Sequence, residues 1–183
     1  MAFFLFCIGS LVTYLLWPQK TRMSIIIFSR PIHSGKTTAL LQWSIHQKTI
    51  YGILMPDING YRKILDLNTK EVFDIECADP ENNSEALTSV GRFHFYNKAF
   101  DKANSIILDA LGKNPAWLLI DEAGKLELEQ KGLYNAIQKA VAVYKNKEAS
   151  GNLLITVRDS LCNEVLSFFK PGDCRLIHNL EEI

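Results

Sequence analysis

The chain has 183 residues, of which 48% are hydrophobic, so it can bury one sizeable core but is too short for two ordinary domains. Its 20 basic and 20 acidic residues cancel, and this balance disfavours nucleic acid as a partner. The four cysteines include no C-x-x-C pair and form no zinc-like cluster with the four histidines, so we expect reduced thiols and a cytoplasmic location.

The first 22 residues differ in composition from the rest of the chain. Residues 2–17 carry no charge and are mostly apolar. A bilayer-spanning helix needs about 20 apolar residues, with a range of about 17 to 25, so this run lies at the lower limit. Three interpretations stay open: a membrane anchor that tethers a cytoplasmic domain, a stretch translated from a misassigned start, or a packed helix. We therefore divide the chain into an apolar leader, residues 1–22, and one domain, residues 23–183.

After the leader, short apolar runs alternate with helical patterns, which is typical of a parallel sheet covered by helices. Strands are predicted at residues 25–29, 50–54, 92–96, 117–120 and 153–157. Helices are predicted at residues 37–46, 98–111, 134–144 and 161–169. Residues 64–67 and 72–75 predict an antiparallel hairpin inserted at the edge of the sheet, and the polar residues 78–89 predict a loop beside it.

The segment between the first strand and the first helix carries a phosphate-binding pattern. Residues 30–37 match the P-loop pattern G-x-x-x-x-G-K-[ST] at every fixed position except the first, where Arg30 replaces glycine. Backbone N–H groups and the helix dipole bind phosphate in such loops. We expect Gly35 to let the backbone approach, Lys36 to reach the β and γ phosphates, and Thr37 to ligate Mg²⁺. The predicted nucleotide-binding residues are Arg30, Pro31, Ile32, His33, Ser34, Gly35, Lys36, Thr37 and Thr38.

The Arg30 substitution allows two outcomes. Either the side chain strains the loop and weakens binding, or its guanidinium folds over the phosphates and compensates.

Two carboxylates, Asp121 and Glu122, end the predicted strand 117–120 in the manner of a Walker B motif. A buried parallel strand would place Asp121 beside the Mg²⁺ held by Thr37. Glu122 would then orient and activate an attacking water. The sequence thus predicts Thr37 and Asp121 as metal ligands and Glu122 as a catalytic residue.

The residues that follow resemble a known family. Residues 121–128 read Asp-Glu-Ala-Gly-Lys-Leu-Glu-Leu, which is similar to the Asp-Glu-Ile-Gly-Lys-Met-Glu-Leu signature of the thermophile-type nucleoside-triphosphatases, including the cancer-related nucleoside-triphosphatase. The segments 60–62 (Gly-Tyr-Arg) and 91–93 (Gly-Arg-Phe) also resemble that layout, so the similarity covers roughly residues 24–165.

This resemblance implies a three-layer α/β P-loop NTPase fold of the RecA-like type, with a mostly parallel sheet and an inserted antiparallel edge hairpin. It also implies slow, Mg²⁺-dependent hydrolysis of ATP, GTP and other nucleoside triphosphates to the diphosphate and phosphate. The same resemblance gives catalytic roles to Lys36 and Glu122. Lys125, Arg62 and Arg158 are candidates for the positive charge that stabilises the γ-phosphate, with a plain surface cation as the alternative for each.

Two other functions remain open on the sequence. A small-molecule kinase would use the same phosphate-binding loop, but no segment concentrates the arginines that such kinases place in a lid. A nucleotide-binding module with little turnover is the second alternative, and Arg30 favours it. The guanine-specific motif Asn-Lys-x-Asp is absent from the sequence, which disfavours a dedicated GTPase.

Overall fold

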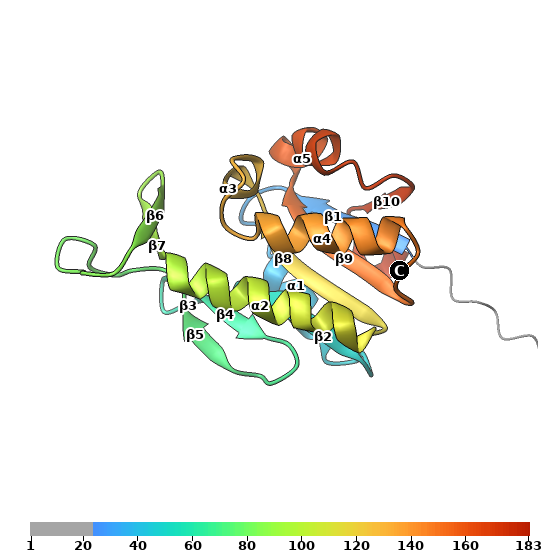
Figure 1. Ribbon diagram of the computed structural model, residues 1–183, viewed down its shortest axis with the longest axis horizontal. Coiled ribbons are helices and arrows are strands. Elements are labelled where there is room, and N and C mark those ends of the chain that lie inside the picture. Colours follow the sequence, from blue (N-terminus) through green and yellow to red (C-terminus); the bar gives the residue numbers. More distant parts are fainter. Residues whose placement is uncertain (1–23) are drawn as a thin grey trace, which may run out of the picture.

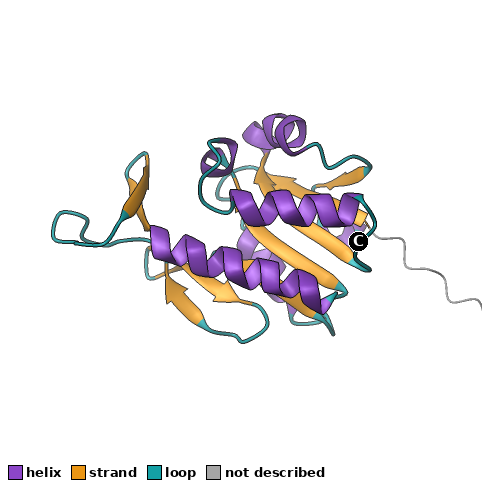
Figure 2. Cartoon of the chain, viewed as in Figure 1, coloured by secondary structure: helices purple, strands orange, loops and turns teal. Residues whose placement is uncertain are grey.

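Strands and helices alternate along residues 24–183, which are the residues that the computed structural model describes (Figures 1 and 2). The predicted leader, residues 1–22, lies outside them. The strands are β1 (Ser24–Arg30), β2 (Ile50–Leu54), β3 (Asp57–Ile58), β4 (Tyr61–Asp66), β5 (Val72–Asp74), β6 (Leu87–Val90), β7 (Phe93–Tyr96), β8 (Trp117–Ala123), β9 (Asn152–Arg158) and β10 (Cys174–Ile177). The helices are α1 (Lys36–Ser44), α2 (Asn97–Lys113), α3 (Lys125–Leu128), α4 (Tyr134–Lys145) and α5 (Cys162–Phe169), with short 3-10 turns η2 (Asp159–Leu161) and η3 (Leu180–Glu182).

The main sheet has the strand order β10-β1-β9-β8-β2-β4-β3. Its pairs from β10 to β2 are parallel, whereas β4 is antiparallel to β2. Strand β5 pairs with β4 in an antiparallel arrangement, which confirms the predicted edge hairpin. The predicted mixed α/β fold with a mostly parallel sheet is therefore confirmed.

Helices cover both faces of this sheet and create two cores. Helices α2 and α4 lie across one face, and α1 lies behind the sheet in the view of Figure 1. The alternation within β1 serves both cores, since Ile25 and Ile27 pack on the α2 and α4 side while Ile26 and Phe28 pack on the α1 side. A strand that is buried on both faces must be apolar at every position, and this explains the unbroken hydrophobic run that predicted it.

Three local predictions differ from the structure. The predicted loop 78–89 runs into β6, which pairs with β7 as a second small sheet. Strand β10 was not predicted, because among its four side chains Ile177 alone is buried and the strand forms no apolar run. Helix α1 ends at Ser44, so Ile45 lies beyond the helix with 73% of its surface exposed.

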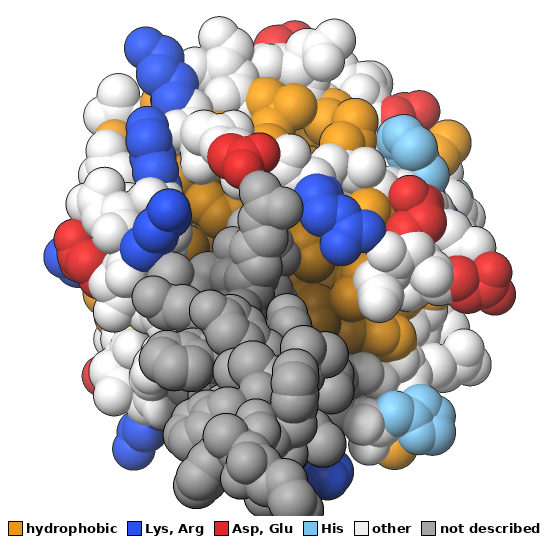
Figure 3. Space-filling model, turned by 90° about the vertical axis from the view of Figure 1, so that its right-hand side faces the viewer, with side chains coloured by type: hydrophobic (Ala, Val, Ile, Leu, Met, Phe, Trp, Pro, Cys, Tyr) orange, Lys and Arg blue, Asp and Glu red, His pale blue; other side chains and the backbone are white. Residues whose placement is uncertain are grey.

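Charges on the surface are mixed. Figure 3 shows one face on which basic and acidic side chains are interspersed with apolar and uncharged ones. None of the helices within residues 24–183 is both long and apolar enough to cross a membrane.

Candidate nucleotide-binding site

The predicted P-loop connects the buried strand β1 to the N-terminus of α1. Its residues 31–35 are exposed, and Gly35 adopts a left-handed conformation with φ 76° immediately before the helix. Residues with a Cβ avoid this conformation, so glycine is favoured here. Apart from Gly35 and its two chain neighbours, no atom of the described chain lies within 4 Å of where a Gly35 Cβ would be, so the backbone faces open space. The loop is thus exposed, and within it the Ser34 N–H donates to the Pro31 carbonyl oxygen at 3.3 Å.

The Lys36 ammonium lies inside the curve of this loop. Its Nζ donates hydrogen bonds to the carbonyl oxygens of Arg30 and Pro31, each at 3.0 Å. Partial burial lowers the pKa of Lys36, and the Asp121 carboxylate opposes this shift. The ammonium therefore lies against the first two residues of the loop, and its contact with phosphate stays a prediction.

The two motifs meet at Thr37 and Asp121, which are 84 positions apart in the sequence. The Thr37 hydroxyl donates to Asp121 Oδ2 at 2.8 Å. Asp121 is buried, and its carboxylate also accepts from the Met55 N–H at 3.0 Å and from the Thr156 hydroxyl at 2.6 Å. These three hydrogen bonds satisfy a buried charge, which would otherwise be very costly.

A β-bulge separates the directions of the two carboxylates. Ile120 pairs with Ile155 and Ala123 with Val157, so Asp121 and Glu122 together oppose the single residue Thr156. Glu122 takes a left-handed backbone conformation with φ 71°, and its N–H donates to the Thr156 hydroxyl at 2.7 Å. Bulges of this kind re-aim side chains beside functional sites. Strand β8 continues to Ala123, one residue beyond the acidic pair, whereas the predicted strand ended at residue 120.

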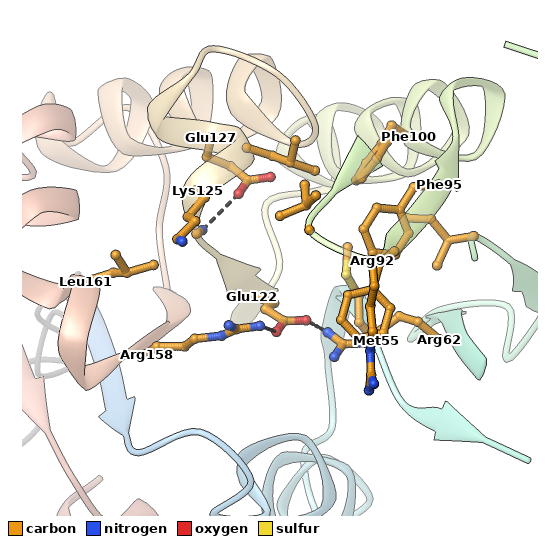
Figure 4. Close-up of a pocket in the computed structure, with 16 residues that line it drawn as sticks. Met55, Arg62, Arg92, Phe95, Phe100, Glu122, Lys125, Glu127, Arg158 and Leu161 are labelled. Atoms are coloured by element: carbon orange, nitrogen blue, oxygen red, sulfur yellow. Dashed lines mark hydrogen bonds and ion pairs between the residues drawn. The ribbon is translucent and has the colours of Figure 1, made fainter. Parts of the chain in front are cut away.

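Two arginines hold the Glu122 carboxylate (Figure 4). Arg62, from β4, forms an ion pair with Oε2, and Arg158, at the end of β9, donates to Oε1 at 2.8 Å. Burial lowers the pKa of Arg62, with the Asp121 carboxylate acting in the opposite direction. Two of the three cations predicted near the γ-phosphate thus contact Glu122 directly.

The Arg30 side chain points away from the loop. Its Nε donates to the His178 carbonyl oxygen at 2.6 Å, and its guanidinium lies 5.0 Å from the centre of the Phe28 ring. Arg30 is the last residue of β1 and has no positive φ, whereas His33 does, with φ 59°. The backbone at Arg30 is extended and its guanidinium contacts the C-terminal segment, while the effect of Arg30 on phosphate binding stays a prediction.

We therefore expect Arg30→Gly to leave triphosphate affinity within about tenfold, or about 1.4 kcal/mol, of the unaltered protein. Turnover should stay level or rise severalfold. Calorimetric titration and a phosphate-release assay measure the two quantities. If the variant loses both binding and turnover, Arg30 is a phosphate ligand after all.

A buried carboxyl group shapes the segment after β8. Glu127, in the short helix α3, accepts hydrogen bonds from the Gly124 N–H at 2.8 Å and the Leu133 N–H at 2.9 Å. Lys125 lies one residue after Gly124, is exposed, and borders the same cavity as Glu122. The carboxyl group thereby fixes the turn that presents Lys125.

Burial raises the pKa of Glu127, although both backbone N–H donors act to lower it. A carboxyl group whose pKa is higher in the folded than in the unfolded state stabilises the fold while it is protonated. This contribution to the unfolding free energy is fully present below the unfolded-state pKa of about 4.3, and it is lost as pH rises through the folded-state pKa. We expect the unfolding free energy of the unaltered protein to fall, relative to that of Glu127→Gln, as pH rises above about 4.3. Urea titrations at several pH values test this, and a relative rise over that range would contradict it.

A cavity of about 280 Å³ adjoins Glu122. Its walls include three phenylalanines and three arginines from different segments: Phe93, Phe95, Phe100, Arg62, Arg92 and Arg158. Phe93 is 37% exposed, so the aromatic part of the wall reaches the surface. The sequence contains no segment rich in arginine, because the fold gathers these arginines from separate parts of the chain. The role of Thr156 at the site was likewise not predicted, although a polar residue within the otherwise apolar strand β9 could have indicated it.

Solved structures include proteins with this architecture at low sequence identity. The crystal structure of THEP1 from the hyperthermophile Aquifex aeolicus superposes with a TM-score of 0.61 at 18% sequence identity, covering 85% of this chain and 88% of that one. The solution structure of a human cancer-related nucleoside triphosphatase superposes with a TM-score of 0.53 at 17% identity, covering 88% and 90%. The chain shares the fold of these two proteins. The resemblance seen in the sequence is thereby confirmed at the level of the fold. No protein-family model and no curated protein matches the sequence itself.

In this P-loop fold the residues present suit a magnesium ion. Thr37 and Asp121 bring a hydroxyl and a carboxylate oxygen within 2.8 Å of each other at the start of α1, and Mg²⁺ prefers such oxygen ligands together with phosphate oxygens and water. Within residues 24–183, no three His, Cys, Asp or Glu side chains converge as a metal site. The donor set therefore fits an ion shared with a bound phosphate.

Proposed function

We propose that the chain binds nucleoside triphosphates at the P-loop and, with Mg²⁺, hydrolyses them to the diphosphate and phosphate. The observation that carries this proposal is the contact between Thr37 and Asp121. It joins the P-loop and the acidic strand into one site, with Glu122 next to it. The fold shared with a human nucleoside triphosphatase supports the same reaction class.

Residues of the P-loop and Asp121 would bind the phosphates and the metal ion. The N–H groups of residues 32–38 surround the phosphates, and the Lys36 ammonium exchanges its two loop carbonyl partners for phosphate oxygens. Thr37 and Asp121 would hold Mg²⁺, which supplies charge neutralisation on the phosphate oxygens when bound.

Glu122 orients a water molecule and accepts its proton as the water attacks the γ-phosphorus. Arg62 and Arg158 both form ion pairs with Glu122. The same two guanidinium groups can stabilise the negative charge that develops on the γ-phosphate. Lys125 adds a further cation at the border of the cavity.

A nucleotide-binding module with little turnover is the second candidate, and one observation favours it. Glu122 is held by two arginines, and a carboxylate in two ion pairs is a weak proton acceptor. Turnover then depends on whether nucleotide draws an arginine away from Glu122.

A phosphate-release assay separates these candidates. The purified protein is given ATP or GTP, with Mg²⁺ or with EDTA. We expect steady release of inorganic phosphate that requires Mg²⁺. Tight binding of nucleotide without release would favour the binding module, and nucleotide consumption that needs an added acceptor would favour a kinase.

A further inference from the structure

The cavity beside Glu122 has a size and an aromatic lining that hydrolysis alone does not require. Water is the only second reactant in hydrolysis, yet the cavity has an aromatic wall and a volume of about 280 Å³. That volume suits a single ring system with one substituent, since drug-sized ligands occupy roughly 300 to 1,000 Å³. The cavity is therefore large enough for a small organic molecule.

The aromatic wall is partly open to solvent. Phe93 and Phe95 stack with their ring centres 6.3 Å apart, and Phe100 meets Phe95 edge-on at 5.9 Å. Phe95 and Phe100 pack into the core, which fixes them, while Phe93 is 37% exposed at the edge. A fixed aromatic wall with an exposed outer ring favours a planar, apolar ligand group.

The cavity is also lined by more basic than acidic side chains. Four basic side chains and two carboxyl groups line it: Arg62, Arg92, Lys125, Arg158, Glu122 and Glu127. Glu122 is paired with two of the arginines, and Glu127 accepts from backbone N–H groups. Among residues 24–183, no acidic side chain forms an ion pair with Arg92, which lies over the Phe93 ring at 5.0 Å. This arrangement places an unneutralised guanidinium directly beside the aromatic wall.

Figure 4 shows how these parts are arranged. Arg92, Phe95 and Phe100 lie on one side of Glu122, and Lys125 and Glu127 lie on another. Asp121 contacts Thr37 at the P-loop, whereas the bulge aims Glu122 at Arg62 and the cavity. The cavity and the P-loop are thus two neighbouring sites that meet at the acidic pair.

We propose that this cavity binds a second ligand, a small aromatic molecule that carries a phosphate or carboxylate group. The ring lies against Phe93 and Phe95, and the anionic group pairs with Arg92. This inference concerns a site separate from the P-loop, so it holds whether or not the chain hydrolyses nucleotides.

The test uses phenyl phosphate as the probe in calorimetric titrations of the full chain. We expect binding in the micromolar to low millimolar range, with inorganic phosphate and benzyl alcohol each binding at least about tenfold more weakly because each offers half of the chemistry. Arg92→Ala should weaken phenyl phosphate by about tenfold, as expected for one charge-assisted contact. Lys139→Ala, which removes an exposed cation on α4 away from the cavity, is the matched control and should change nothing.

Lys36→Ala separates this site from the P-loop. The variant should keep its affinity for phenyl phosphate, and a non-hydrolysable triphosphate should not displace the probe from the unaltered protein. The proposal is overturned if phenyl phosphate does not bind at about 10 mM, a concentration at which even weak ligands are detected. It is also overturned if Arg92→Ala has no effect, or if the triphosphate displaces the probe.

Discussion

Replacing Glu122 with glutamine should slow nucleotide hydrolysis by about 10² to 10⁴ while Mg²⁺-nucleotide binding persists, because a positioned general base contributes that much. Glutamine has almost the same shape, and its amide oxygen can still accept from Arg158, which donates to Oε1 at 2.8 Å. The bulge that places residue 122 rests on backbone pairing and on the Thr156 hydroxyl. The substitution therefore removes the proton acceptor and leaves the backbone in place.

Rates of phosphate release and affinities for a non-hydrolysable analogue should be measured for this variant side by side. Glu129→Gln is a suitable control, since Glu129 is exposed and pairs only with Lys131 among the described residues. Unchanged turnover in Glu122→Gln would show that this carboxylate serves only to pair with Arg62 and Arg158.

Loss of the Lys36 ammonium is expected to reduce triphosphate affinity by about 10²-fold or more, because hydrogen bonds to charged groups contribute about 1.5 to 3 kcal/mol each. The ammonium now bonds two carbonyl oxygens of an otherwise exposed loop. Water can replace it there, so Lys36→Ala should cost little stability.

Calorimetry with a triphosphate analogue measures the affinity, and thermal melting without nucleotide checks the fold. Lys48→Ala provides the control, since this exposed lysine lies past the end of α1 and outside the loop. If Lys36→Ala binds the analogue as tightly as the unaltered protein does, the P-loop assignment is wrong.

The sequence predicted the parts of this site that depend on local pattern. Lys36 and Thr37 follow a buried strand and begin a helix, and Asp121 follows a second buried strand, so their residue types and spacing suffice. Parallel strands bring their carboxyl ends to one edge of a sheet, and this geometry accounts for the meeting of Thr37 with Asp121. The roles of these residues in catalysis remain predictions.

The features that were missed depend on contacts between distant segments. The bulge at Glu122 exists because Thr156 satisfies a backbone N–H and a carboxylate at once, and no local pattern predicts such a pairing. Strand β10 is short and half exposed, and it is held by parallel pairing with β1. The cavity likewise draws Arg62, Arg92 and Arg158 from three separate segments.

The most direct test of the central claim is a crystal structure of the protein with Mg²⁺ and a non-hydrolysable triphosphate. We expect the phosphates in the loop of residues 30–37, with Lys36 moved from its carbonyl partners to phosphate oxygens and Mg²⁺ next to Thr37 and Asp121. Glu122 should face the γ-phosphate through a water molecule. A triphosphate bound in the aromatic cavity, or anywhere away from Lys36, would contradict the account.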